Sequence, residues 1–265
     1  MKKTIIFSLL ILLFVVGGIA LWQNKNFFGE RPVEVTSVIV EESTTTPESL
    51  GATVEMVTVN EELQRRATVI LSRAIRGGET LPPAVREDLA RQIREATAVL
   101  KNDYNNIQPW ITLGLARKGL DDYEGAAEAW EFASVIRPKN ALSFANLGFL
   151  YGSYLKDYAR AEKNYLRAIA NDPREVTAYN NLADLYWYSI PEKRAAIPDL
   201  IARGLEVNAD RDRRAPLLAR LALYYKESGA FGKAADVVEE IMRLLPDNAG
   251  LAAELAELRA KAASE

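Results

Sequence analysis

The sequence predicts an all-α fold, a solenoid of stacked helix pairs preceded by one apolar segment that can span a membrane. Three observations predict it. From Glu61 onward, apolar residues recur three and four positions apart, which is the period of an amphipathic helix. The pattern repeats itself at about 34 residues, as in helical-repeat proteins. Finally, Thr4 to Trp22 form a run of 19 residues without a charge.

Composition argues against several classes of function. The chain has 265 residues, of which 33 are basic and 36 acidic, for a net charge of −3. Nucleic-acid binding needs a concentrated basic surface, so nucleic acid is not an expected partner. There are no cysteines and no histidines, which removes thiol nucleophiles, the commonest general base and the commonest transition-metal ligands. We therefore expect a protein that is not an enzyme and needs no metal or cofactor.

The amino-terminal run from Thr4 to Trp22 is interpreted as a transmembrane signal-anchor over residues 1–22. As a helix it would be about 28 Å long, close to the hydrocarbon thickness of a bilayer. Lys2 and Lys3 precede it, which favours a cytoplasmic amino terminus and places the rest of the chain outside the cytoplasm. Two alternatives stay open. One is a signal peptide cleaved near Ala20, after which the protein would be secreted. The other is a buried core helix.

Residues 23–60 are interpreted as a flexible linker. The central segment from Glu41 to Ser49 is polar, contains a proline and lacks periodicity. Its flanks, Val33 to Val40 and Ala52 to Val59, are rich in β-branched residues and could pair as short strands. A spacer that lifts the folded part away from the membrane is the favoured interpretation.

Four units between residues 107 and 248 carry the same residue types at the same positions. Large side chains fill the core, small ones let the two helices of a pair approach closely, and a proline ends the pair because it cannot continue a helix. The first two units read Trp110, Leu113, Gly114, Tyr123, Ala126, Trp130, Ala133, Pro138 and Phe144, Leu147, Gly148, Tyr158, Ala161, Tyr165, Ala168, Pro173. The last two read Tyr179, Leu182, Ala183, Ala196, Leu200, Gly204 and Leu218, Leu221, Ala222, Phe231, Ala234, Val238, Ile241, Pro246.

This pattern resembles the tetratricopeptide repeat (TPR) family over residues 107–248. The resemblance implies a right-handed superhelical solenoid of TPR helix pairs. The third unit departs from the pattern, because Ile190-Pro191 and Pro198 fall near its inter-helix turn. We expect its second helix to start late or to be kinked. The charged segment from Asp210 to Arg214 is expected to lengthen the next turn.

Segments on both sides of the four units are expected to cap them. Residues 61–106 read as a degenerate or capping helix pair, Glu61 to Arg76 and Pro83 to Lys101. Residues 249–265 contain an amphipathic helix that would cover the last stacking face, with its leucines on one side. These leucines are Leu251, Leu255 and Leu258.

Catalytic signals are weak. The adjacent carboxylates Asp121-Asp122 and Glu239-Glu240 point in different directions on a helix and do not form an acid–base pair. Ser153 and Lys156 have the S-x-x-K spacing of a serine nucleophile motif, but the rest of that motif set is missing. A turn or a solvated face explains each of them more simply.

The resemblance also implies a binding site, because the first helices of TPR pairs line a concave groove that binds extended peptides. Asn146 and Asn181 recur at one repeat position, and an asparagine amide can hydrogen-bond a peptide backbone. A carboxylate clamp is not expected, since Ile111 and Leu115 stand where it needs polar residues. The predicted groove residues are Ile111, Leu115, Lys118, Leu142, Asn146, Phe149, Asn180, Asn181, Asp184, Trp187, Tyr188, Arg220 and Leu223.

The expected function is that of a membrane-anchored scaffold or adaptor that binds protein partners in extracytoplasmic assembly or translocation. The membrane contact would be made by residues 4–22. Fold alone does not fix function, so two alternatives from other classes stay open. One is a self-associating structural envelope protein, and the other is an exported enzyme with a Ser/Lys or carboxylate site.

Overall fold

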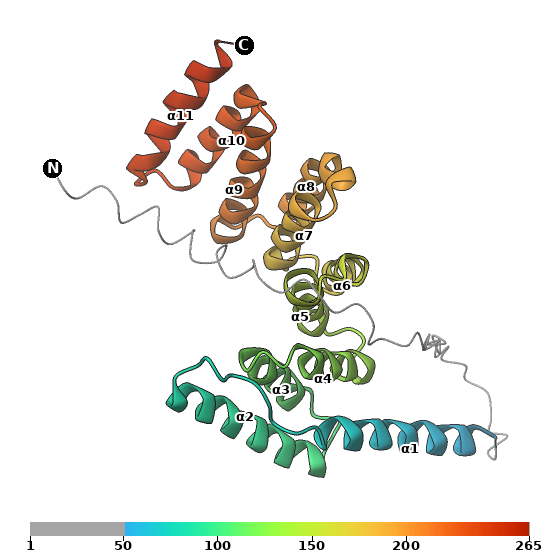
Figure 1. The fold of residues 1–265 in the computed structure, drawn as a ribbon. Coiled ribbons are helices and arrows are strands. Elements are labelled where there is room, and N and C mark those ends of the chain that lie inside the picture. Colours follow the sequence, from blue (N-terminus) through green and yellow to red (C-terminus); the bar gives the residue numbers. More distant parts are fainter. Residues whose placement is uncertain (1–50, 265) are drawn as a thin grey trace. The chain divides into compact units, whose positions relative to one another are not determined.

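The computed structural model describes residues 51–264, with side chains from residue 60 onward. Within this range the chain is helical and contains no strand, so the expected all-α repeat architecture is confirmed (Figure 1). The α-helices are α1 (Gly51–Leu71), α2 (Pro83–Asn102), α3 (Ile107–Gly119), α4 (Tyr123–Ile136), α5 (Ala141–Leu150), α6 (Tyr158–Asn171), α7 (Val176–Tyr188), α8 (Ile197–Val207), α9 (Arg211–Glu227), α10 (Phe231–Leu244) and α11 (Ala249–Ala262).

None of these helices combines the length and the apolar character that a bilayer crossing requires. The predicted anchor at residues 1–22, the cleavage position near Ala20 and most of the predicted linker lie outside the described residues.

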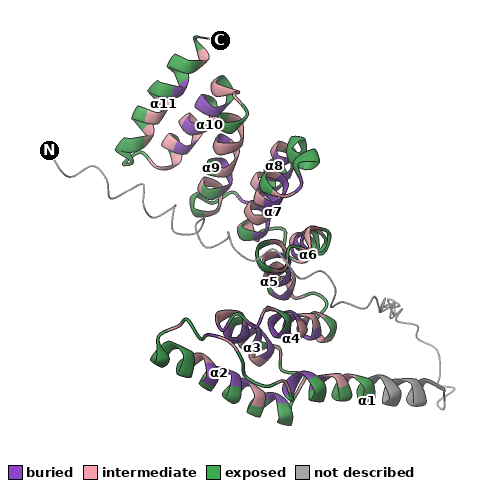
Figure 2. Ribbon diagram, viewed as in Figure 1, coloured by how far each residue is buried: buried purple, intermediate pink, exposed green. Residues whose placement is uncertain are grey.

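The four predicted units correspond to the pairs α3–α4, α5–α6, α7–α8 and α9–α10. The two helices of each pair pack against each other, and the second helix of each pair packs on the first helix of the next. First helices also contact one another, α5 with α7 and α7 with α9. Buried residues follow the sides on which helices meet (Figure 2). The pairs therefore form one continuous stack.

Local sequence signals set the ends of these helices. Asn140, Asp157 and Asp210 cap α5, α6 and α9 by accepting backbone hydrogen bonds from the residue three positions later. Prolines stand just beyond the last residues of α4, α6 and α10, where they prevent continuation. These are Pro138, Pro173 and Pro246.

Glycine permits the closest helix contacts. A Cβ atom on Gly114 would lie 2.6 Å from Cδ1 of Trp130, and one on Gly148 would lie 2.6 Å from Cδ1 of Tyr165. The Trp130 indole therefore crosses α3 with no room for a side chain beneath it. Its Nε1 also donates a 3.2 Å hydrogen bond to the carbonyl oxygen of Ile111.

The third unit differs from the others at its inter-helix turn, as the prolines there predicted. A 3-10 helix, η3, runs from Pro191 to Ala196, and α8 begins only at Ile197, so the late start is confirmed. The role given to Ala196 is wrong: it is exposed in η3, and Gly204 on α8 packs closely against Tyr179 and Leu217 instead. Pro191 delays the start of α8, so the small residue that makes the close helix contact is Gly204, further along the chain.

The charged segment Asp210 to Arg214 does not lengthen a turn as expected. Asp210 caps α9, and Arg211 to Arg214 form its first turn. Arg214 donates to Glu240 on α10 at 2.7 Å and to the carbonyl oxygen of Leu205 at 3.1 Å. The charged segment is therefore part of a helix that makes contacts with α8 and α10. Its inclusion makes α9 longer than the other first helices.

The boundary expected at Glu61 is also corrected, because α1 begins at Gly51 and includes the segment Ala52 to Val59. The linker prediction fails for residues 51–60, since β-branched residues disfavour a helix only weakly. The two N-terminal helices pack on the first unit: α2 lies along α3, and α1 contacts both α2 and α4. At the other end, Leu258 of α11 is buried against the fourth pair, and Leu251 and Leu255 are partly buried against the same cluster.

A buried ionic cluster joins the α1–α2 connection to the first unit. The Arg117 side chain is 1% exposed and donates to Oδ2 of Asp122 at 2.6 Å and to the carbonyl oxygen of Arg73 at 2.9 Å. Arg73 in turn donates to Oδ1 of Asp122 at 2.7 Å. Asp122 also caps α4 by accepting from Gly125 N. One carboxylate therefore holds three segments together.

Burial would raise the pKa of Asp122, but hydrogen bonds from Arg73 and Arg117 outweigh it, so the net pKa lies below the ordinary value. The folded state therefore binds the proton less readily than the unfolded chain. The stabilisation is fully present above the unfolded pKa of about 3.9 and is lost as the pH falls through the lower folded pKa.

The helix contact at Gly114 gives the first prediction. Gly114→Ala should destabilise the protein by about 1–3 kcal/mol, because the new methyl group overpacks against Trp130. Gly232→Ala on α10 is the matched control, since its Cβ would meet only the methyl group of Ala262 at 3.9 Å. The control should be neutral or slightly stabilising. Urea unfolding of both variants measures this, and equal stabilities would contradict the packing described.

The ionic cluster gives the second prediction. Asp122→Asn should lower the free energy of unfolding by about 3–5 kcal/mol near neutral pH, because it leaves the Arg117 charge buried without its partner. Asp88→Asn, in an exposed pair with Arg91, should leave the melting temperature almost unchanged. Unfolding at a series of pH values provides the further test. The difference between wild type and Asp122→Asn should hold above about pH 5 and shrink below about pH 4. A difference independent of pH would show that the carboxylate charge is not responsible.

Candidate functional site: the first-helix face

The structure keeps most predicted groove residues at the surface of the first helices. Ile111 is the exception: it is 3% exposed and belongs to the core, so its assignment to the groove is wrong. Helix α3 is covered by α2 as well as α4, which widens its buried side. We define the first-helix face by the remaining positions on α3, α5, α7 and α9: Leu115, Lys118, Leu142, Asn146, Phe149, Asn180, Asn181, Asp184, Trp187, Tyr188, Arg220 and Leu223.

Three large apolar or aromatic side chains on this face are well exposed. Leu115 on α3 is 44% exposed, Leu142 on α5 is 48% exposed and Tyr188 on α7 is 65% exposed. Phe149, Trp187 and Leu223 are only partly buried and add apolar surface. Exposed apolar side chains gathered on one set of helices mark an interaction surface more often than a passive one.

Phe149 lies in an aromatic cluster between the first two units. Its ring meets Tyr154 edge to face at 5.7 Å between centroids, and Tyr154 stacks on Tyr123 at 4.4 Å. The Lys118 ammonium lies 5.2 Å from the Phe149 centroid. Two predicted residues from different helices, α3 and α5, are thus brought together by a cation–π contact.

Helices α7 and α9 bring together a second group of predicted residues. The Arg220 guanidinium pairs with the Asp184 carboxylate, with its NH2 group 2.9 Å from Oδ2. Trp187 packs edge to face on Tyr224 at 5.7 Å, and the Arg194 guanidinium covers the Trp187 ring at 4.9 Å. Trp187 is therefore held on two sides and offers only part of its ring to a partner.

Acidic side chains outnumber basic ones among the charges that act on Asp184 and Tyr188. Burial raises the pKa of Asp184; Arg220 opposes that shift, and the neighbouring Glu227 carboxylate adds to it. Burial likewise raises the pKa of Tyr188; the carboxylates of Glu227 and Asp184 reinforce the shift, and the Arg220 guanidinium opposes it. Two carboxylates and one guanidinium thus act on the same small region.

The asparagines are placed differently from the prediction. Nδ2 of Asn146 and Oδ1 of Asn180 are enclosed and have no hydrogen-bond partner among the described residues. An enclosed amide atom reaches a peptide backbone only after its side chain turns. Asn181 is partly buried on the same face. The amides of Asn146 and Asn180 are therefore not both free to hydrogen-bond a peptide backbone as they stand.

The weak catalytic signals have structural explanations. Ser153 is exposed in a π-helical turn, η2 (Tyr151–Leu155), and Lys156 follows it with a left-handed φ of 56°. No hydrogen bond joins these two side chains in the part of the chain that the structure describes. Glu239 pairs with Arg259 and Glu240 with Arg214. Over residues 60–264, no group of three or more acidic side chains is placed to hold a metal ion.

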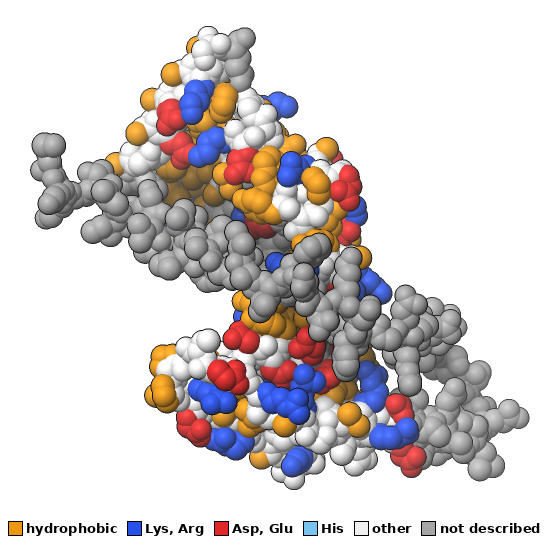
Figure 3. All heavy atoms as spheres, viewed as in Figure 1, with side chains coloured by type: hydrophobic (Ala, Val, Ile, Leu, Met, Phe, Trp, Pro, Cys, Tyr) orange, Lys and Arg blue, Asp and Glu red, His pale blue; other side chains and the backbone are white. Residues whose placement is uncertain are grey.

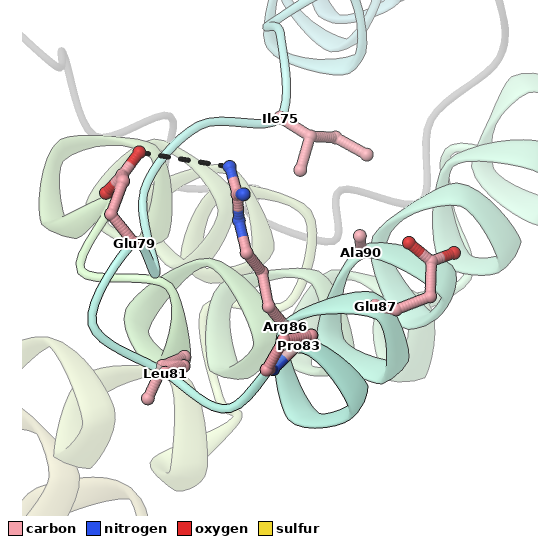
Figure 4. Close-up of a pocket in the computed structure, with 7 residues that line it drawn as sticks. All are labelled: Ile75, Glu79, Leu81, Pro83, Arg86, Glu87 and Ala90. Carbon is pink, nitrogen blue, oxygen red and sulfur yellow. Dashed lines mark ion pairs between the residues drawn. The ribbon is translucent and has the colours of Figure 1, made fainter.

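Two cavities lie away from the first-helix face, in the N-terminal helices. One, of about 350 Å³, is formed by the α1–α2 connection and the start of α2 (Figure 4). Arg86 crosses it, donating through Nε to the carbonyl oxygen of Gly77 at 3.0 Å and lying 3.9 Å from Glu79. The second, of about 280 Å³, lies between α1 and the end of α2. On the face shown in Figure 3, basic and acidic side chains intermix over the N-terminal helices.

Sequence reasoning missed three residues that shape these sites. Glu227 and Tyr224 extend the first-helix face on α9, and Asp122 is a buried ion-pair partner where a solvated turn was expected. A signal existed for Tyr224 and Glu227, which follow Arg220 at the helical spacings of four and seven. Arg117 lies only five residues before Asp122, but the sequence gives no sign that the second partner is Arg73, which lies 49 residues earlier.

Comparisons with known proteins identify the architecture. No family model matches the chain. In sequence, it is 28% identical over 114 residues to tetratricopeptide repeat protein 37 of Xenopus laevis; the match covers 40% of this chain and only 6% of that relative. In structure, it is similar to MamA, with a TM-score of 0.51 and 18% identity over 63% of this chain and 94% of that one.

It is equally similar, with a TM-score of 0.51, to a tetratricopeptide repeat protein from Parabacteroides merdae, at 17% identity over 78% of this chain and 74% of that one. At such identities the structural likeness shows the fold alone. The chain thus has the fold of a TPR-like helical-repeat protein, and its function must be argued from the first-helix face.

Proposed function

We propose that the protein is a membrane-anchored scaffold that binds an extended segment of a protein partner on its first-helix face. The observation that carries the proposal is the exposure of Leu115, Leu142 and Tyr188 on successive first helices of one stack. Burying such side chains against a partner would gain about 25 cal/mol for each Å² of apolar surface. Partly buried Phe149 and Trp187 lie on the same helices and would add to the contact.

The arrangement supports binding better than catalysis. On the first-helix face, Asp184 is joined to Arg220 in an ion pair, and the Lys118 ammonium lies over the Phe149 ring. The Ser153 hydroxyl and the Lys156 amine are not joined to each other. We therefore propose a partner-binding function without a chemical step, metal or cofactor, and with no role for nucleic acid.

Attachment to the membrane is the second part of the proposal. It rests on the charge-free run from Thr4 to Trp22 and on Lys2 and Lys3 before it. In this arrangement the amino terminus is cytoplasmic and the repeats are extracytoplasmic. The scaffold would then hold its partner close to the outer surface of the membrane, which suits assembly or translocation. Cleavage near Ala20 would release the same binding module.

The binding face is tested with two similarly exposed leucines on opposite members of a helix pair. Leu142→Ser on α5 should weaken capture of a partner, identified first by crosslinking in the native membrane, by a factor of about ten or more. Leu166→Ser on α6, where the leucine is 40% exposed, should capture the partner as the wild type does. Neither variant should change the melting temperature appreciably. Equal capture by both variants, or loss only with Leu166→Ser, would place the binding surface elsewhere.

The topology is tested through the absence of cysteine from the chain, because a single introduced thiol is then a unique label. Ser228→Cys, an exposed position at the end of α9, should react with a membrane-impermeant maleimide in cells whose outer layer is permeable. Lys3→Cys should react only after the membrane is broken. The reverse pattern would contradict the orientation, and a mature chain lacking residue 3 would show cleavage instead of anchoring.

A further inference from the structure

Some aromatic rings in the repeats lie under a cation supplied by the same chain. Within residues 60–264, seven such contacts occur, at ring-centroid distances from 4.3 to 5.8 Å. They are Arg160 on Tyr151, Arg194 on Trp187, Lys118 on Phe149, Lys233 on Tyr225, Lys261 on Phe231, Lys193 on Tyr186 and Arg167 on Phe144. Other rings of the repeats, such as that of Tyr154, carry no such cation from the described residues, and Tyr188 is more exposed than Tyr154. The Tyr188 side chain is 65% exposed, and within residues 60–264 no cation lies over its ring.

The contact between α7 and α9 defines the surroundings of Tyr188. Asp184 meets Arg220, and one turn further along each helix Trp187 meets Tyr224. Both contacts advance in the same direction along the two helices. Tyr188 directly follows Trp187, Glu227 lies one turn beyond Tyr224, and each is the last residue of its helix. Tyr188 also lies one turn after Asp184 on the same helix.

The charges around Tyr188 do not balance. Arg220 is paired with Asp184, whereas exposed Glu227 has no ion-pair partner among the described residues. Both carboxylates raise the pKa of Tyr188 and Arg220 lowers it, so two negative charges and one positive charge act on its hydroxyl group. An exposed aromatic ring near an unpaired carboxylate suits a cation, because the cation can make a cation–π contact with the ring and an ion pair with the carboxylate. An acidic side chain would be repelled, and an apolar one would leave Glu227 without a partner.

We infer that Tyr188, Glu227 and Asp184 form a subsite for a lysine or arginine side chain of the bound segment. The inference rests on the proposed function, since it assigns a chemical class to one residue of the partner. The cationic group lies over the Tyr188 ring and pairs with Glu227, while Asp184 remains shared with Arg220. The aliphatic part of the same side chain packs along the partly buried edge of Leu223 or Tyr188.

The test begins with random dodecapeptides displayed on phage and selected on the full chain purified in mild detergent. The selected peptides should carry lysine or arginine at one common position. The strongest binder is then synthesised, together with a version in which norleucine replaces that lysine, so that shape is kept and charge is lost. The substitution should weaken binding by about fivefold, the sum of an exposed ion pair and a cation–π contact.

Variants of the chain complete a double-mutant cycle. Glu227→Gln should weaken binding of the lysine peptide several-fold and leave the norleucine peptide unchanged. Glu206→Gln, an exposed carboxylate on α8 without an ion pair in the described residues, is the matched control and should change neither. Peptides without a basic preference that bind wild type and Glu227→Gln equally, yet are weakened by Leu142→Ser, would overturn the inference and leave the proposed function standing. Failure to select any peptide, or binding unaffected by all of these variants, would overturn both.

Discussion

Gly114 lies against the indole of Trp130, and Gly148 lies against the ring of Tyr165, so an aromatic ring of the second helix fills the space where the first helix has no side chain. The rest of the stack depends on this close approach. The glycine-bearing helix α5 also contacts the next first helix, α7, which in turn contacts α9. The exposed residues of the first-helix face are therefore positioned by contacts on the opposite, buried side of the same helices.

A different kind of interaction attaches the N-terminal helices. The Arg117–Asp122 pair is buried and also receives Arg73 from the α1–α2 connection. Such a pair adds little net stability compared with apolar packing, but removing one partner is costly. Its geometry fixes the connection after α1 relative to the turn of the first unit. The repeats thus combine apolar stacking, which sets helix spacing, with one ionic cluster that determines where an atypical segment docks.

The sequence predicted the helix pairs, the core role of Trp130 and the late start of α8, because each follows from residues close together in the chain. It could not predict that Ile111 is buried, because the width of a buried stripe depends on how many neighbours cover a helix, and α2 lacks the repeat motif. It could not predict the ionic cluster, since Asp122 resembles an ordinary turn residue until Arg73 is brought to it. Glu227 was missed because its significance depends on the register between α7 and α9. Errors thus arise where long-range contacts decide the outcome.

The central claim is that the first helices, and not the second helices, present the contact surface for a partner. Site-specific photocrosslinking in native membranes tests it most directly, with a photoreactive residue at Leu115, Leu142 or Tyr188, or at the similarly exposed Val135, Leu166 or Val207 on α4, α6 and α8. The account predicts adducts to one discrete protein from the three first-helix positions and none from the second-helix positions. Adducts from the second helices alone, or from all six positions equally, would contradict it, and adducts only to a second copy of this chain would identify self-assembly instead.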